Sequence, residues 1–466
     1  MSRPAARRLL AGLAAAVAAL GVPPAIAPAS ATAPSPTPAS CPAVGTRLQV
    51  TASTRLDPRC TYGGIDIAAS HVTLDCRGAT IEGDPERGGR GIAIVTPATV
   101  ALTDVTVRRC RVEGFLNGLR VSRDGFRDLP VGDEFADPTS RIVIEDSTFH
   151  GSRGVGIFVD AFASGVTIRR NRIHGAGSSG VYLEAGSRRN RVEANEIVDN
   201  GFRESGPGGQ PITFRGLKLW FWGVGREGIS VDGSSENAIV GNRLEGNAAG
   251  GIFLYKNCGE NASTPGAWIR RYPASGNRIE ANTFRGGRNG VWVGSRMGEN
   301  TLPMACADPA YVNEGLVRVV LDRADRNVVR ANLFTDVTYG VRVEDDHTTV
   351  DANWFRGSAP DRHAVVIGTP YRTARLGLPV RGTVLTRNVS TIAGNANPYR
   401  WVEGEADTVV RANVAQGRLV GICEGQPLPR QPFIFAIAVA PANPDGTAPP
   451  APDLTVPTVG ALPACG

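Results

Sequence analysis

A unit of 23 or 24 residues that opens on glycine recurs through the middle of the chain. Examples are "GIFVDAFASGVTIRRNRIHG" from 156, "GVYLEAGSRRNRVEANEIVDNG" from 180, "GISVDGSSENAIVGNRLEGN" from 228 and "GIFLYKNC" from 251. Each unit holds short runs of alternating apolar residues separated by Gly, Asn and Asp, a pattern typical of strands and too short for helices. Because helical solenoids need about 33 residues or more per repeat, this period excludes them.

Alternation means that one face of every strand is buried, and stacking the units as parallel strands joins these faces into one core. Leucine-rich repeats share the length, but their leucine-dense signature is absent. The pattern therefore predicts an all-β fold, a right-handed parallel β-helix (solenoid) of roughly ten to twelve turns with inserted loops and capped ends, over residues 61–421. Asparagines five residues apart are expected to form hydrogen-bonded ladders inside the turns. These pairs are Asn190 and Asn195, Asn237 and Asn242, Asn277 and Asn282, and Asn327 and Asn332.

The two ends of the chain differ from the repeats. Residues 1–33 are typical of a secretory signal peptide, because arginines precede the apolar stretch "LLAGLAAAVAALGV" and small-residue cleavage sites follow near Ala31 or Ala33. Residues 34–60 are expected to form a linker and N-terminal cap, and residues 422–466 a proline-rich C-terminal tail. No later segment reaches about 18 apolar residues, so no transmembrane segment is expected. We expect a monomer that is secreted outside the cell or to the cell envelope.

Eight cysteines in an exported chain indicate disulfides. Three pairs would close local loops, and they are Cys41–Cys60, Cys258–Cys306 and Cys423–Cys465. Cys76 and Cys110 are left over, and no pair has the close CxxC spacing of a zinc or redox site. The formal net charge of +6 falls to +3 without the three arginines of residues 1–33, which is too small for a nucleic-acid partner.

Equivalent residues of adjacent turns lie about 4.8 Å apart, so the repeats can be compared as columns. The fourth residue after each opening glycine is Asp160, Glu184, Asp232, Tyr255, Gly294 and Glu344, and the second is Phe158, Tyr182, Ser230, Phe253, Trp292 and Arg342. We expect both columns to lie outside the core, with exposed aromatic side chains beside charges that suit sugar rings. Insertions beside them would wall a groove, and the one from 202 to 227 carries Lys218, Trp220 and Trp222. Tyr182, Tyr255, Trp292, Arg342, Trp220, Trp222 and Lys218 are the predicted substrate-binding residues.

Lys256 is one of only two lysines, and arginine supplies the positive charge almost everywhere else. A lysine can lose its proton when burial and a neighbouring cation depress its pKa, whereas an arginine stays charged. Arg296 lies about one turn further along the chain. The pair fits β-elimination, in which a base removes the proton next to a carboxylate and a cation stabilises the intermediate.

The stretch "LDCRGATIEG" and the Asn-containing turns resemble the parallel β-helix repeat proteins of bacteria. That superfamily includes polysaccharide lyases, mannuronan epimerases, glycosidases, phage tailspikes and proteins without known chemistry. "LYKN" followed by "GVWVGSRMG" is similar to the lysine-then-arginine arrangement of β-helix alginate and chondroitin lyases, in which acids just before the lysine hold calcium. Here "AAGGIFLY" has no acid, so a calcium ion would need Asp160, Glu184 and Asp232 from earlier turns.

Three functions remain open. The first is a lyase that cleaves a uronic-acid-containing glycan, with Lys256, Arg296, Asp232 and Glu184 as the catalytic residues. The second is a glycoside hydrolase that uses the Asp/Glu column, because adjacent turns place carboxylates near the retaining distance of about 5 Å. The third is a non-catalytic glycan-binding or envelope surface protein, in which the acids bond their own turns and the tryptophans only pin their loop.

Overall fold

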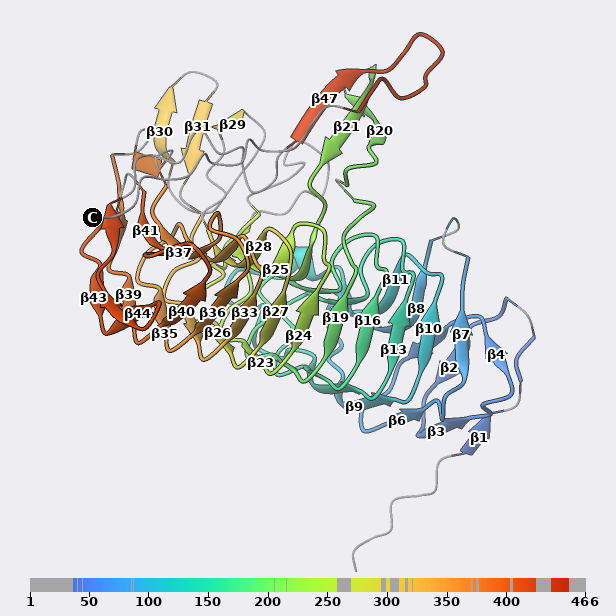
Figure 1. Ribbon diagram of the computed structural model, residues 1–466. Helices are drawn as coiled ribbons and strands as arrows, with labels where there is room; N and C mark the ends of the chain where they lie inside the picture. Colours follow the sequence, from blue (N-terminus) through green and yellow to red (C-terminus); the bar gives the residue numbers. More distant parts are fainter. Residues whose placement is uncertain are drawn as a thin grey trace, which may run out of the picture. The chain divides into compact units, whose positions relative to one another are not determined.

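The structure is a computed structural model, and the residues that it describes are 37–39, 41–43, 45–84, 86, 88–204, 206–214, 216–257, 270–294, 299–301, 310–314, 317–320, 322–369, 372–373, 377–402, 405–424 and 437–451. Three long sheets dominate it, and each turn of the chain visits them in the order sheet 1, sheet 2, sheet 3 (Figure 1). One such turn is called a rung below.

Sheet 1 contains, in spatial order, β2 (Leu48–Val50), β5 (Ile65–Ile67), β8 (Arg90–Pro97), β11 (Asn117–Asp124), β14 (Ile157–Val159), β17 (Val181–Glu184), β22 (Glu227–Asp232), β25 (Gly250–Tyr255), β28 (Asn289–Val293), β34 (Tyr339–Val343), β37 (His363–Ile367), β41 (Tyr399–Trp401) and β46 (Cys423–Glu424). Sheet 2 contains β1 (Thr37–Ala39), β3 (Thr54–Leu56), β6 (Thr73–Asp75), β9 (Thr103–Arg108), β12 (Ser140–Glu145), β15 (Thr167–Arg169), β18 (Arg191–Glu193), β23 (Ala238–Val240), β26 (Arg278–Glu280), β32 (Val328–Arg330), β35 (Thr349–Asp351), β39 (Val384–Thr386) and β43 (Val409–Arg411).

Sheet 3 contains β4 (Thr61–Tyr62), β7 (Thr80–Glu82), β10 (Arg111–Glu113), β13 (Thr148–His150), β16 (Arg172–His174), β19 (Glu196–Val198), β24 (Arg243–Glu245), β27 (Thr283–Arg285), β33 (Leu333–Thr335), β36 (Trp354–Gly357), β40 (Val389–Ile392), β44 (Asn413–Ala415) and the antiparallel β45 (Arg418–Val420). The predicted parallel β-helix is therefore present, and each sheet has thirteen strands. Within residues 61–421, sheets 1 and 2 have eleven strands each, in agreement with the predicted ten to twelve turns. Strands before residue 61 already pair within it, so the expected N-terminal cap supplies the first rungs.

The core lies between the three sheets. Register partners such as Val181, Ile229 and Ile252 stack their inward side chains from rung to rung, and all three are fully buried. In sheet 3 the rings of Phe284, Phe334 and Phe355 stack at centroid distances of 4.6 and 4.8 Å. Every strand contributes only its alternate residues to this core, and the residues between them lie on the outer faces of the sheets.

Two asparagine ladders confirm the prediction made from the five-residue spacing. At the corner between sheets 2 and 3, the side-chain amides of successive rungs are hydrogen-bonded in a row at 2.9–3.1 Å. Its members are Asn171, Asn195, Asn242, Asn282, Asn332, Asn353, Asn388 and Asn413. The shorter second ladder contains Asn190, Asn237, Asn277 and Asn327. Both rows satisfy backbone groups that the tight turns leave inside the protein.

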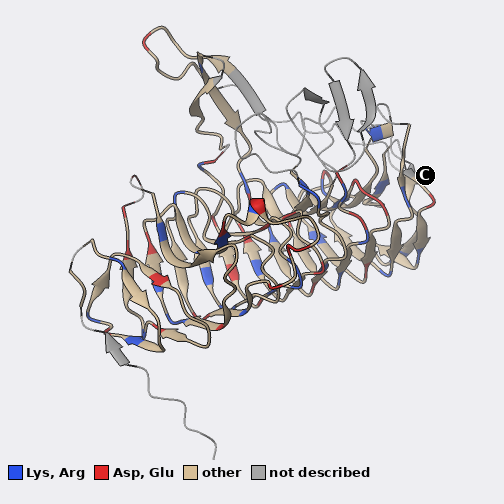
Figure 2. Cartoon of the chain, turned by 180° about the vertical axis from the view of Figure 1, so that it is seen from behind, with Lys and Arg blue, Asp and Glu red and all other residues tan. Residues whose placement is uncertain are grey.

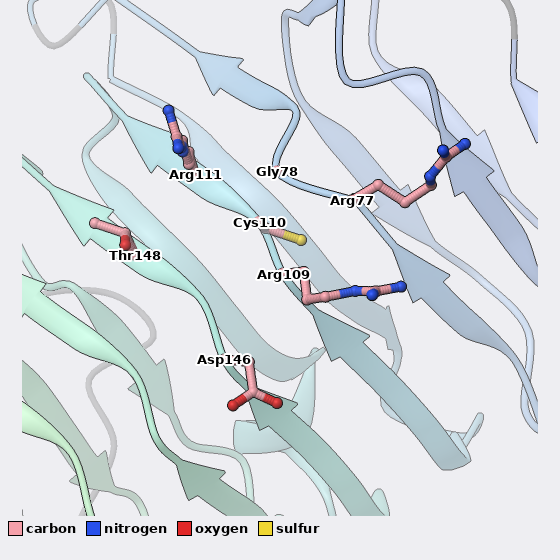
Figure 3. A pocket seen from close by; sticks show the side chains of 7 residues that line it. All are labelled: Arg77, Gly78, Arg109, Cys110, Arg111, Asp146 and Thr148. Carbon is pink, nitrogen blue, oxygen red and sulfur yellow. The ribbon is translucent and has the colours of Figure 1, made fainter.

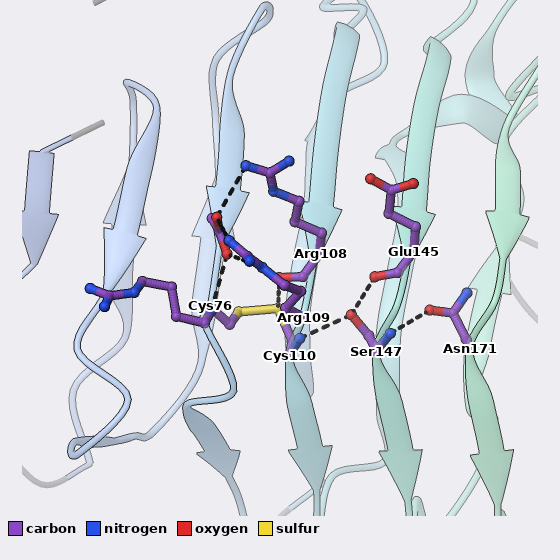
Figure 4. Close-up of a disulfide and its surroundings, with 9 residues drawn as sticks. Cys76, Arg108, Arg109, Cys110, Glu145, Ser147 and Asn171 are labelled. Atoms are coloured by element: carbon purple, nitrogen blue, oxygen red, sulfur yellow. Dashed lines mark hydrogen bonds and ion pairs between the residues drawn. A yellow bond between two sulfur atoms is a disulfide. The ribbon is translucent and has the colours of Figure 1, made fainter. Parts of the chain in front are cut away.

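A disulfide takes the place of the long ladder in the early rungs (Figure 4). Ser147 donates its backbone N–H to Asn171 Oδ1 at 3.0 Å and accepts the N–H of Cys110 on its hydroxyl at 3.0 Å. Cys110 is bonded to Cys76, the pair that the sequence left over. The expected Cys41–Cys60 disulfide is also present, and such bonds fit an oxidising compartment.

The other expected disulfides are only partly visible. Cys423 is disulfide-bonded, and its expected partner Cys465 lies outside the described residues. Cys258 and Cys306 also lie outside them, as does the expected signal segment of residues 1–33.

The C-terminal tail returns to an insertion in the middle of the chain. Strands β20 (Gln210–Phe214) and β21 (Leu217–Gly223) form a hairpin, and β47 (Ile437–Pro441) pairs with β21 in antiparallel fashion (Figure 1).

The remaining short elements are η1 (Phe126–Asp128), β29 (Glu299–Thr301), β30 (Ala310–Glu314), β31 (Val317–Val320), β38 (Val380–Arg381) and β42 (Glu405–Ala406). Among the described residues, no helix is long and apolar enough to cross a membrane. Positively and negatively charged residues are interspersed along the coil rather than separated by sign (Figure 2).

Candidate functional site

The columns predicted from the glycine-opened repeats are present on the outer face of sheet 1. Tyr182, Ser230, Phe253, Trp292 and Arg342 are successive register partners on neighbouring strands. Glu184, Asp232 and Tyr255 are register partners in the same way. This face therefore carries acids on its earlier rungs and aromatic and basic side chains on its later ones.

The expectation that these side chains are exposed is wrong. Asp232, Tyr255 and Lys256 have 0% exposure, and Tyr182, Trp292 and Arg342 are also buried. They lie outside the main core, but neighbouring side chains cover them; Phe253, Tyr255, Trp292 and Ala249, for example, form a second apolar cluster. An outward position in the repeat pattern predicts which face a side chain occupies, and it does not predict what the inserted segments place over that face.

Glu184 and Asp232 are bridged by Arg270, which belongs to the insertion after β25. The guanidinium of Arg270 donates to Glu184, and its Nη1 lies 3.4 Å from Asp232 Oδ2. Asp232 also accepts Tyr182 Oη at 2.7 Å and the backbone N–H of Asn257 at 2.6 Å. Among the described residues, the hydrogen-bond and ion-pair partners of Asp232 are all donors.

The environments of Glu184 and its neighbours shift their proton affinities. Burial raises the pKa of Glu184 above its usual range, and the nearby Asp232 and Asp160 add to this effect although Arg270 opposes it. Burial also raises the pKa of Tyr182 well above its ordinary value, with Asp232 contributing in the same direction. The pKa of Arg270 is raised because Asp232 and Glu184 outweigh its burial, so this guanidinium stays charged. Glu184 and Arg270 each retain 17% side-chain exposure, which leaves this ion pair as the accessible part of the cluster.

The other predicted catalytic positions are less accessible or undescribed. The side chain of Lys256 runs beside Gly233, since its Cγ would lie 3.7 Å from a Cβ placed on that glycine. Lys256 therefore packs against the residue that follows Asp232, and it is fully buried. Arg296 lies outside the described residues.

The acids proposed for calcium do not fit such a site. Asp160 accepts Arg120 Nη2 at 2.6 Å, and Glu184 and Asp232 face Arg270. Calcium takes six to eight oxygen ligands, whereas these carboxylates are surrounded by N–H donors and a phenol. The described residues contain no group of three or more His, Cys, Asp and Glu side chains suited to a metal ion.

A second polar network, which the repeat pattern did not predict, surrounds Glu227 at the start of β22. Glu227 is fully buried and accepts hydrogen bonds from Ser230 Oγ and, at 2.8 Å, from Tyr255 Oη. Arg226 donates to the same phenol oxygen at 2.8 Å. The sequence contains a signal for it, because Glu227 directly precedes the opening glycine of its repeat.

The hairpin of β20 and β21 places the predicted loop residues in different settings. Trp222 is buried, so it pins the hairpin, whereas Trp220 is half-buried and Lys218 is exposed. The two indole rings lie 6.2 Å apart. Strand β47 pairs with this part of β21, with Ala440 opposite Trp220.

A pocket of about 500 Å³ lies elsewhere, at the corner between sheets 2 and 3 (Figure 3). Its lining residues are Arg77, Gly78, Arg109, Cys110, Arg111, Asp146 and Thr148. None of them belongs to sheet 1, and Arg109 is already bound to the buried carboxylate of Asp75. This pocket is therefore separate from the acid cluster.

A family model described as "Right handed beta helix region" matches residues 59–302. The chain belongs to this right-handed β-helix family. No curated protein matches the chain. Solved structures share its fold at low sequence identity, and this likeness concerns the fold alone.

Three of these structures illustrate the range. The A-module of a mannuronan C-5 epimerase from Azotobacter vinelandii is 14% identical, with a TM-score of 0.48 over 82% of this chain and 85% of that chain. An alginate lyase from a Paenibacillus species is 10% identical, with a TM-score of 0.35 over 81% and 92%. The catalytic domain of a GH87 alpha-1,3-glucanase, in complex with tetrasaccharides, is 12% identical, with a TM-score of 0.50 over 81% of this chain and 63% of that chain.

Proposed function

We propose that the chain is a secreted enzyme that cleaves glycosidic bonds in a polysaccharide, with Glu184 as the residue that exchanges the proton. The pairing of Glu184 with Asp232 on adjacent rungs carries this proposal. Adjacent rungs lie about 4.8 Å apart, close to the separation of about 5 Å between the two carboxyl groups of retaining hydrolases. The glucanase domain of the same fold in complex with tetrasaccharides is compatible with such a use of the scaffold.

The different surroundings of the two acids suggest different roles. Glu184 is partly exposed and has a raised pKa, as a proton donor to the leaving oxygen requires. Asp232 is fully buried, so its proposed role is to hold Tyr182 and Arg270 in place beside Glu184 rather than to touch the sugar. Trp220 and Lys218, on the insertion between β19 and β22, are the proposed contacts of the rest of the sugar chain.

Elimination is the second candidate, because Arg270 contacts this acid pair and Lys256 packs against Gly233, the residue after Asp232. Lys256 would be the base, and Arg270 or Arg296 would bind the carboxylate of a uronic acid. The geometry favours hydrolysis over elimination, since Lys256 is fully buried while Glu184 is partly exposed. Replacing Lys256→Arg keeps the charge, so it should lower turnover by about 10²- to 10⁴-fold only if the amine is the base.

The test is incubation of the purified protein with a panel of uronate polysaccharides and neutral glycans. Hydrolysis predicts new reducing ends without ultraviolet absorbance from an unsaturated product. An unsaturated product would replace hydrolysis with elimination. Unchanged chains across the panel would overturn the enzymatic proposal and leave a binding or surface protein.

A further inference from the structure

Four buried polar atoms lie close together on the outer face of sheet 1 and make no hydrogen bond within the described part of the chain. They are Arg288 Nη2, Asn289 Oδ1, Arg342 Nη1 and His363 Nδ1. More than about 90% of buried polar groups in proteins have a partner, and burying one without a partner costs free energy. Four such atoms in neighbouring rungs therefore point to a ligand.

The register places these groups on three consecutive strands. Asn289 on β28, Tyr339 on β34 and His363 on β37 are successive register partners, and Arg342 lies on the middle strand. The ring of Tyr339 lies 5.6 Å from that of His363 and 5.5 Å from the Arg342 guanidinium. The groups consequently face the same side of sheet 1 as Asp232, which lies two rungs before β28.

The charge of this cluster is positive. Arg342 is paired with Glu344 through Nη2, which leaves its buried Nη1 unbound. Burial, and then the guanidinium of Arg342, lower the pKa of Arg288, as expected for two cations held close together. Burial lowers the pKa of His363 to about 4, so its ring is neutral at pH 7 and adds no charge. Among the described residues, Glu344 pairs with Arg342, while Arg400 and Asp361 also act on His363 with opposite signs. An anion bound between Arg288 and Arg342 would relieve the repulsion between these two guanidiniums.

We propose that Arg288 and Arg342 bind the acid group of an anionic sugar residue in the polysaccharide that the Glu184–Asp232 site cleaves. Guanidinium groups suit this role because they present paired donors to a planar or tetrahedral anion. Arg288, which is half-buried, connects the cluster to solvent and is the first contact of the acid group. This inference rests on the proposed function and adds the substrate class, a negatively charged glycan.

The test is equilibrium binding by calorimetry with the Glu184→Gln protein, which prevents turnover. The probes are a polyuronate, the same polymer after carboxyl reduction, and a sulfated neutral glucan. We expect the polyuronate or the sulfated glucan to bind more tightly than the carboxyl-reduced polymer, and the tighter of the two identifies the acid group. Failure of both acidic polymers to exceed the reduced one would overturn the proposal.

Variants locate the binding. Arg288→Gln and Arg342→Gln should each weaken binding of the acidic polymer by about ten- to a hundredfold, the range expected for a lost hydrogen bond to a charged group. Arg342→Lys should recover part of the loss. Arg285→Gln, an exposed arginine on sheet 3 of the same rung, is the matched control and should change affinity less than twofold. If Arg342→Gln does not fold, Arg288→Gln decides alone.

Unchanged affinity in the arginine variants would assign the four atoms to bound water and overturn the proposal. The two failures are distinguishable. A Glu184→Gln protein that still cleaves its substrate would overturn the proposed function, whereas equal affinity for the acidic and carboxyl-reduced polymers would overturn the present proposal.

Discussion

Arg270 contacts the carboxylates of both Glu184 and Asp232, although it lies 86 residues after the first of them in the chain. An opposite charge at this distance lowers the pKa of a carboxyl group, while burial raises it. For Glu184 burial prevails, so its pKa stays above the usual range even with the guanidinium present. The guanidinium therefore sets how far the proton affinity of the proposed acid is raised.

Replacing Arg270→Gln should shift the pH–rate profile. A proton donor is active below its pKa and loses activity as the pH rises through it, so Glu184 defines the alkaline limb. Removing the cation raises the pKa of Glu184 further, and the alkaline limb of kcat/KM should move to higher pH by roughly one unit. Arg278→Gln, which breaks an ion pair with Glu280 on sheet 2, is the control and should leave the limb in place. A shift to lower pH would contradict the assignment.

Asp345 should make the protein less stable as the pH rises. Burial raises the pKa of Asp345 to about 6, against about 3.9 in an unfolded chain. Because the folded-state pKa is the higher one, the stabilising contribution is present below about pH 4 and is lost as the pH rises through 6. Between pH 4 and 7 the wild-type protein should therefore lose about 2 kcal/mol more unfolding free energy than Asp345→Asn. Equal losses in the two proteins, measured by denaturant unfolding, would argue against a raised pKa.

The asparagine ladder should carry a large share of the local stability. Asn282 accepts Asn242 Nδ2 at 2.9 Å and donates to Asn332 Oδ1 at 3.0 Å and to the carbonyl of Ile239 at 2.8 Å. Asn282→Ala removes these bonds inside the protein and should lower the unfolding free energy by about 2–4 kcal/mol. The adjacent Thr283→Ala, on the exposed face of β27, should cost less than about 0.5 kcal/mol. Similar losses for both variants would show that the ladder contributes no more than a surface side chain.

Repetition made the main coil and its columns predictable. A constant period places Tyr182, Ser230 and Phe253 in register, and the spacing of Asn190 and Asn195 predicts two ladders at once. These features depend on the alternation of apolar residues within a strand and on stacking against the next rung. The sequence of the repeat unit determines both.

The candidate site was less predictable, because its decisive contacts come from segments outside the repeat. Arg270 comes from an insertion, and β47 reaches β21 from the C-terminal tail, so no column contains either relationship. Glu227 and Asn289 each directly precede an opening glycine, so the position before that glycine contains both residues. Burial of Lys256 and Tyr255 depends on packing over the outer face, which alternation alone does not determine.

The most direct measurement of the central claim is the turnover of Glu184→Gln on the polysaccharide that the wild-type protein cleaves. The amide preserves the shape of the side chain and removes its proton, so kcat should fall by about 10²- to 10⁴-fold while the fold, checked by thermal unfolding, is retained. Glu193→Gln, a glutamate of the same rung on sheet 2, should keep kcat within about twofold because exposed ion pairs contribute little. A Glu184→Gln protein with undiminished turnover would contradict the account.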